Sequence, residues 1–284
     1  MQDFVALLGV KGGPAIRPGS NMPTSTLVSL AGRTILVDAG LGATRGVCDQ
    51  GIALGSLDAI VVTHLHSDHY LELGPLLHTS WTAGLNRTMP VFGPPRLARY
   101  WTAFLEAMRD DIDLRIADEG RPDLARLVEI RPLDTECATV LGDVTLRAME
   151  NVHPPVEPSY ALRIEGGGKA VVLSGDTAFM PEMAVFASGA DLLVHEAMLE
   201  HGVDALIAKV PNGGERLRTH ILRSHTSAED AGRVAGAAGV ARLALNHFVP
   251  DGLPEFTEDD WKRAVRRTWD GAMILGRDGL RIDL

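Results

Sequence analysis

Three histidines and an aspartate lie within six consecutive positions of the stretch VVTHLHSDHY (61–70). They are His64, His66, Asp68 and His69. Imidazole and carboxylate groups without thiolates suit Zn²⁺, and they also suit iron or manganese. Two histidines that lie two positions apart in a tight loop can reach one ion, and the aspartate and histidine after them can reach a neighbouring ion. The stretch therefore predicts part of a metal site.

Three further candidate ligands follow predicted strands elsewhere in the chain. His153 comes after VTLRAME, Asp176 ends AVVLSGD and His247 follows RLALN. Strand ends at one rim of a sheet lie close in space, and loops there commonly carry function. Seven ligands are too many for one tetrahedral ion and suit two ions that share a carboxylate. We predict that His64, His66 and His153 hold the first ion, that Asp68, His69 and His247 hold the second, and that Asp176 bridges them.

Three other histidines and the two cysteines are not expected to bind metal. A single buried histidine is usually just hydrogen-bonded, and we expect this of His78, His201 and His220. The two cysteines, Cys48 and Cys137, form neither a C-x-x-C pair nor a disulfide framework. They are expected to be reduced thiols, because disulfides are rare in cytoplasmic proteins.

Composition and charge bear on the number of domains, the cellular location and the kind of molecule that the protein binds. The chain has 284 residues, a length ordinary for one large α/β domain, so the predicted domain is 1–284. No apolar run approaches the roughly 20 residues that span a bilayer, and the first residues do not resemble a signal peptide, so we predict a cytoplasmic protein. The formal net charge of −10 repels polyanions, which makes nucleic acid an unexpected partner.

The elements that must position these ligands fall into two batches of strands. Residues 25–30 and 34–40 are β-rich runs joined by AGR, which is a hairpin signal, and 57–63 is an apolar strand that ends in the histidine-rich loop. Later runs repeat the pattern, with a glycine-rich turn at 166–169. The pattern predicts an α/β fold, an αββα sandwich of two mixed β-sheets with helices on the outer faces. A single parallel sheet fits less well, because hairpins imply antiparallel pairing.

Helical patterns separate or follow these strands. Residues 70–83 are expected to be helical, and 97–108 place apolar residues at helical spacing, which indicates a face packed on the core. Residues 227–239 form a predicted helix opened by Ser227. A helix over 257–267 and two short strands are expected at the C-terminus.

The order of the motifs resembles a known superfamily. THLHSDH, followed by NVH, SGDT and NHF, is similar to the metallo-β-lactamase superfamily over nearly the whole chain. The resemblance implies the same αββα sandwich and two metal ions. It also implies that Asp38, in LVDAG, braces the metal-binding loop.

Two further motifs resemble one branch of that superfamily. VHEAM and SHTSAEDAG look like the ribonuclease Z branch, which includes arylsulfatase-like members, and VFGPP and LRIADEG also resemble the latter. The resemblance implies that Glu196 and His225 act together in proton transfer. The chain leaves room only for a hairpin between His153 and Asp176, where tRNA-processing members carry an arm. An additional segment, 199–223, could cap the active site, serve packing or form a dimer contact.

Together these features predict a dinuclear metal-dependent hydrolase. We expect two divalent ions, with zinc preferred over iron or manganese, and a metal-bridging hydroxide as nucleophile. Asp68 would orient that hydroxide, and His225 with Glu196 would protonate the leaving oxygen. The expected substrate is a small anionic or ester-type molecule, an aryl sulfate or a phosphodiester. A lactone or carboxylic ester, or tRNA 3′-processing of the ribonuclease Z type, is the alternative, and a homodimer is an open possibility.

Overall fold

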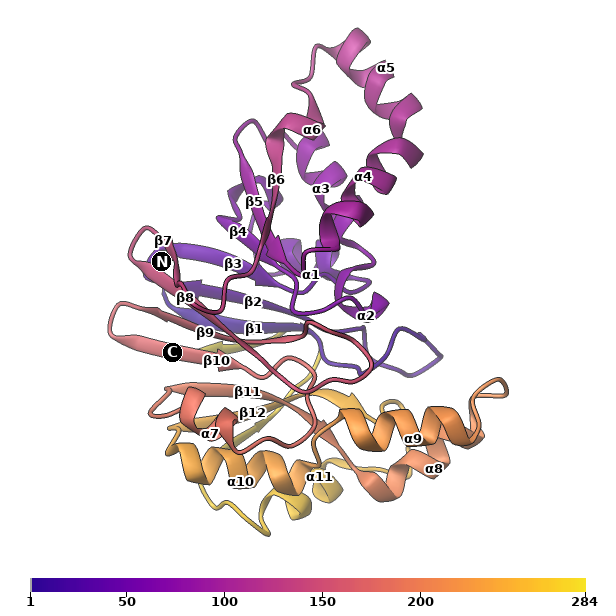
Figure 1. Cartoon of the computed structure of the whole chain (residues 1–284), viewed down its shortest axis with the longest axis vertical. Helices are drawn as coiled ribbons and strands as arrows, with labels where there is room; N and C mark the ends of the chain where they lie inside the picture. Colours follow the sequence, from indigo (N-terminus) through magenta and orange to yellow (C-terminus); the bar gives the residue numbers. More distant parts are fainter. Residues whose placement is uncertain (1) are drawn as a thin grey trace.

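Two seven-stranded sheets lie face to face with helices on their outer faces (Figure 1). The structure is a computed structural model that describes residues 2–284. In spatial order the first sheet contains β14 (Leu280–Asp283), β1 (Phe4–Gly9), β2 (Ser25–Leu30), β3 (Arg33–Val37), β4 (Ala59–Val61), β5 (Met89–Gly93) and β6 (Val128–Pro132). The second contains β13 (Ala272–Leu275), β12 (Arg242–Val249), β11 (Leu192–Met198), β10 (Lys169–Leu173), β9 (Tyr160–Gly166), β8 (Val144–Glu150) and β7 (Thr139–Leu141).

Both sheets are mixed, as the hairpin signals predict. The pairs from β14 to β3 are antiparallel and those from β3 to β6 are parallel. The β2–β3 hairpin turns at Ala31 and Gly32, which both have positive φ (47° and 75°), as a two-residue hairpin turn of the primed type requires. The αββα sandwich predicted from the sequence is confirmed.

The helices cover the outer faces and leave the sheet-to-sheet space to apolar side chains. Five helices pack on the first sheet, toward the upper right in Figure 1: α1 (Ala43–Asp49), α3 (Leu73–Thr82), α4 (Leu97–Ala107), α5 (Arg109–Glu119) and α6 (Leu124–Leu127). Below the second lie α7 (Glu182–Phe186), α10 (Ala228–Ala238) and α11 (Glu258–Val265). The predicted apolar face of α4 packs on the core, with Leu97 and Trp101 buried.

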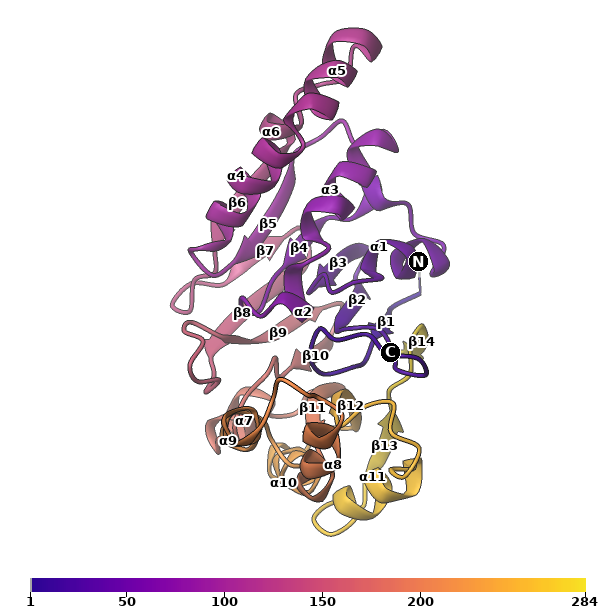
Figure 2. The same cartoon turned by 90° about the vertical axis from the view of Figure 1, so that its right-hand side faces the viewer.

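One helix pair does not cover a sheet face. After β11 the chain forms η2 (Glu200–Gly202), α8 (Val203–Ala208) and α9 (Glu215–Ser224), which lie at one end of the sandwich (Figures 1 and 2). Val203 and Ile221 of this pair pack with Met198 and Val249 in a small apolar cluster of their own. Among the described residues, no helix combines the length and apolarity needed to cross a bilayer.

Candidate metal centre

The histidine-rich loop and three other strand ends meet between the two sheets. The loop follows β4 in the first sheet and continues into the short helix α2 (Ser67–Tyr70). His153 and Asp176 follow β8 and β10 of the second sheet, and His247 lies near the end of β12. The structure therefore brings all seven predicted ligands together, in two overlapping groups that share Asp176. The grouping is the one that we predicted from the spacing.

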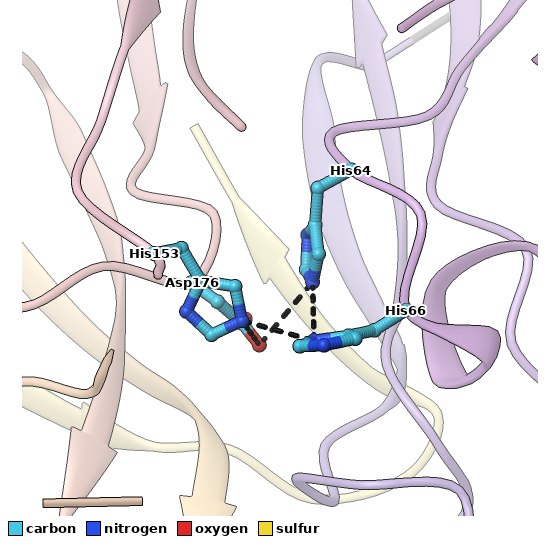
Figure 3. A group of neighbouring side chains, drawn as sticks. All are labelled: His64, His66, His153 and Asp176. Atoms are coloured by element: carbon cyan, nitrogen blue, oxygen red, sulfur yellow. Dashed lines mark hydrogen bonds and ion pairs between the residues drawn. The ribbon is translucent and has the colours of Figure 1, made fainter. Parts of the chain in front are cut away.

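The first group contains three histidines around one carboxylate. His66 Nδ1 lies 3.2 Å from His64 Nε2 and 3.0 Å from His153 Nε2. Asp176 Oδ2 lies 3.8 Å from His64 Nε2 and 3.9 Å from His153 Nε2. Figure 3 shows the two loop histidines pointing toward His153 and Asp176, which come from the opposite sheet. Four ligand atoms thus converge on one point, as they do around a bound ion.

The second group adds the other half of the loop. Asp176 Oδ2 lies 3.0 Å from His247 Nε2 and 3.3 Å from His69 Nε2. Asp68 Oδ2 lies 3.3 Å from His247 Nε2 and 3.6 Å from His69 Nε2. The Asp176 carboxylate therefore faces both groups, which is the position of a bridging ligand.

Neighbouring groups fix the orientation of individual ligands. His69 Nδ1 donates to Asp38 Oδ2 at 2.8 Å, and the Asp38 carboxylate also accepts from the Thr63 backbone N–H at 2.8 Å. His153 Nδ1 donates to the Ser224 carbonyl at 2.9 Å. Each of these bonds engages Nδ1 and directs Nε2 toward the clusters, which is how ligand histidines are usually oriented. Asp38 thus occupies the bracing position that the resemblance implied.

The donor set fits divalent cations. Within the described chain, His69 Nε2 is buried without a hydrogen-bond partner, although its other nitrogen is bonded. Five imidazoles and two carboxylates gather here, all buried except the half-buried His66, and within residues 2–284 none of them is paired with a lysine or arginine. Asp38 and His247 also hold positive φ (62° and 45°), a strained conformation for non-glycine residues that concentrates at functional sites.

The pKa values of the cluster histidines are shifted in two directions, down in some and up in others. Burial disfavours the charged form of His64 and His153, which puts the pKa of His64 well below its ordinary value and that of His153 at about 3. Burial also disfavours charge on His247, but Asp176 outweighs it and raises the pKa of His247 to about 10. Ion binding to the second group would therefore displace protons from its histidines.

Glu196 and His225 form a buried pair beside the second group. Glu196, in β11, lies with Oε2 2.9 Å from His225 Nδ1, which donates to it. The other oxygen, Oε1, accepts from the Thr177 backbone N–H at 2.6 Å. Burial opposes charge on His225, but the Glu196 carboxylate outweighs it and raises the pKa of His225. The His225 ring lies 5.4 Å from that of His247, so the imidazole that is bonded to Glu196 faces the metal clusters.

A cavity of about 280 Å³ opens onto these groups. Asp68, Asp176, His225 and His247 line one side of it. Leu206 of α8, Val210 in the loop after it, and three residues of α9 also line the cavity: Leu217, His220 and Ile221. The segment 199–223 therefore shapes the pocket at the candidate centre. His220 is hydrogen-bonded as expected from the sequence, with Nδ1 3.4 Å from Ser224 Oγ, but it also lines this pocket, which the sequence did not predict.

Sequence reasoning also missed the loop that follows β1. Lys11, Gly12 and Gly13 line the cavity, and the Gly13 N–H donates to Asp68 Oδ2 at 2.7 Å. The glycine pair in GVKGGP was the available signal, because glycines often mark a close backbone approach to a site. His78 behaves as expected, with Nε2 2.9 Å from Asp111 Oδ2 and away from the clusters.

Comparison with known proteins identifies the family. Residues 5–248 match the sequence model of a family described as Anti-Pycsar protein Apyc1. The chain is 32% identical to ribonuclease Z of Mycobacterium bovis BCG over 283 residues, which cover 99% of this chain and 98% of the relative. It superposes on the metallo-β-lactamase fold protein YhfI of Bacillus subtilis with a TM-score of 0.72 and 20% identity, covering 100% of both chains. The chain belongs to the Apyc1 and ribonuclease Z branch of the metallo-β-lactamase superfamily.

Membership of this branch makes the chain a metal-dependent hydrolase that uses divalent ions. A further structure of the same fold is Zn²⁺-bound PqqB from Methylobacterium extorquens, with a TM-score of 0.66, 17% identity, and coverage of 99% of this chain and 100% of that one. The predictions of the superfamily, the branch and the enzyme class are confirmed.

Proposed function

We propose that the chain hydrolyses a small phosphodiester with two divalent ions held between its sheets. His64, His66 and His153 would hold one ion, Asp68, His69 and His247 the other, and Asp176 would bridge them. The observation that carries the proposal is one pocket of about 280 Å³ lined by members of both ligand clusters, the bridging candidate Asp176 among them, and by His225, which donates to Glu196. When bound, such ions activate water near neutral pH and polarise a phosphoryl oxygen.

Residues of the chain would hold the orienting carboxylate in place and supply a proton. The Gly13 N–H holds Asp68, the proposed orienting carboxylate, in one orientation. His225 donates from Nδ1 to Glu196 of β11, and its ring lies 5.4 Å from that of His247. A departing alkoxide needs a proton, and a positioned acid is typically worth about 10² to 10⁴ in rate. We therefore assign proton donation to His225 and support of its charge to Glu196.

Two observations favour a small phosphodiester over the other expected substrates. The relative is named a ribonuclease, and ribonucleases cleave phosphodiester bonds, whereas nothing in the comparisons points to sulfate esters. The pocket is small, about 280 Å³, and its lining includes Leu206, Leu217 and Ile221. Its volume lies just below the about 300 to 1,000 Å³ of typical small-molecule sites.

RNA processing is the second candidate, because of the name of the relative. Two features weigh against it. Between His153 and Asp176 the structure has only the β9–β10 hairpin, which turns at Gly167 and Gly168. The chain carries a net charge of −10. Binding a long RNA needs many lysines and arginines along its backbone, and such binding weakens steeply with salt.

The test is a substrate panel on protein reconstituted with zinc, manganese or iron. It contains bis(p-nitrophenyl) phosphate, linear and cyclic nucleotide diesters, p-nitrophenyl sulfate, a lactone and a pre-tRNA with a 3′ trailer. We expect turnover of small diesters at rates that change little with salt. The Asp176→Ala variant, purified in the same way, controls for contaminating phosphatases. Efficient, salt-sensitive removal of the trailer with every small substrate ignored would show that the nuclease alternative is right.

A further inference from the structure

Lys11 is a buried cation beside the candidate metal centre that the proposed mechanism does not use. It lies just after β1 and is only 4% exposed. Its Nζ donates to the Gly12 carbonyl at 2.6 Å and to the Gly13 carbonyl at 2.7 Å, and these are its only side-chain hydrogen bonds within residues 2–284. An ammonium group has three N–H donors, so one of them has no protein acceptor.

Burying such a group is costly, and the structure does not offset the cost with a carboxylate partner. Buried charges are normally paired, because removing an ion from water costs several kcal/mol. Burial accordingly lowers the pKa of Lys11, while the charges of Asp68 and Asp251 oppose that shift from beyond contact distance. A costly group that serves no ion pair in the folded protein points to a role with a bound molecule.

The backbone next to Lys11 packs closely against the metal clusters. A Cβ added to Gly12 would lie 2.9 Å from the His247 ring, so only glycine lets the loop approach that closely. The Gly13 N–H donates to Asp68 Oδ2. Lys11, Gly12 and Gly13 line the same pocket as Asp68, Asp176 and His247, so Lys11 borders the space where the substrate would lie.

We propose that Lys11 is a substrate-binding residue whose free N–H donates to an anionic phosphoryl oxygen of the substrate. The inference rests on the proposed phosphodiester hydrolysis and adds a third cationic group to the two ions. Hydrogen bonds from preorganised donors in a site shielded from water stabilise charge at little reorganisation cost. The bound anion would also supply the missing partner of the buried ammonium group.

The direct test is calorimetric titration of inorganic phosphate into the metal-loaded protein and its Lys11→Met and Lys11→Gln variants. Methionine keeps the apolar stem, and glutamine can still donate to the loop carbonyls but carries no charge. We expect both variants to bind phosphate about 10- to 100-fold more weakly, as loss of a hydrogen bond to a charged group implies. Metal content and melting temperature should stay at the wild-type values.

Three results would overturn the inference. Wild-type affinity for phosphate in both variants would show that Lys11 does not touch the anion. Recovery of binding by glutamine alone, or loss of metal in both variants, would show that Lys11 only positions the loop. Because phosphate binding needs no turnover, the inference is tested even if wild-type protein cleaves no phosphodiester, a result that would refute the proposed function instead.

Discussion

At the scale of single residues, the groups behind the proposed ligands matter as much as the ligands. Asp38 is buried and holds both His69 and the start of the metal-binding loop through Thr63. Such supporting groups orient a ligand ring and raise its basicity. Their loss should weaken metal binding without removing any ligand.

We therefore expect Asp38→Asn to lower metal affinity about 10- to 100-fold. Competition with a chromophoric chelator measures this affinity. Asp111→Asn is the matched control, because Asp111 also contacts a histidine at 2.9 Å but lies on α5, away from the clusters. Equal affinities in the Asp38 variant and the control would contradict the bracing role.

The proposed acid pair makes a different prediction. Glu196→Gln and His225→Ala should reduce turnover by about 10² to 10⁴ while metal content is retained, since neither residue is a proposed ligand. The loss should be smaller for nitrophenolate leaving groups, which need no proton. Steady-state kinetics on a series of leaving groups measures it, and equal losses across the series would indicate that the pair is structural.

At the scale of elements, the sequence predicts where strands lie and where they end better than which sheet each strand joins. The loop after β4 and the two batches of strands are readable because ligand spacing and hairpin turns are local features. Sheet membership is not local, and the two C-terminal strands show this. The structure places β13 in the second sheet and β14 in the first.

The pocket positions of His220 and Lys11 were not predicted for the same reason, because they depend on contacts between distant parts of the chain. His220 follows Leu217 and precedes Ile221 on one face of α9, at the spacing i, i+3 and i+4. That periodicity predicts that His220 shares the apolar face, but only the docking of α9 beside the loop histidines reveals what the face meets. Lys11 gives no local signal at all, because its burial depends on the approach of β12 to the loop after β1.

One element-scale prediction concerns His195 in β11, which pairs with β10 and β12 on either side. Burial lowers the pKa of His195 to about 4, whereas in the unfolded chain it is about 6.5. Between these values the unfolded state binds the extra proton, so this residue reduces stability as the pH falls below about 6.5. The loss should reach about 2 kcal/mol at pH 5 and about 3 kcal/mol below pH 4.

His195→Gln should remove this dependence, because glutamine does not titrate. Urea unfolding of both metal-free proteins at pH 7 and pH 5 measures it. The free energy of unfolding of wild type should fall relative to that of the variant between the two pH values. An identical change in both proteins would mean that His195 does not stay neutral in the folded state.

At the scale of the whole molecule, the proposed ions would join the two sheets. His64, His66, Asp68 and His69 come from the first sheet, and the other ligands from the second. A ligand that binds only the folded state stabilises it by about 4 kcal/mol at 1,000 times its dissociation constant. Chelation should therefore lower the melting temperature, by on the order of 10 °C for a chain of this size.

Differential scanning fluorimetry with and without a chelator measures this shift. The Asp176→Ala variant should melt at nearly the same temperature in both conditions, since it lacks the proposed bridging ligand. A chelator shift of equal size in wild type and variant would show that the ions stabilise the fold from somewhere other than the predicted clusters.

The most direct test of the central claim is the metal content of the purified, active protein, measured by elemental analysis together with hydrolytic activity. We predict up to two equivalents of zinc, iron or manganese per chain in wild type, and joint loss of metal and activity in Asp176→Ala. Active wild-type protein that contains no metal, and whose activity a chelator leaves unchanged, would contradict the two-metal centre and the function built on it.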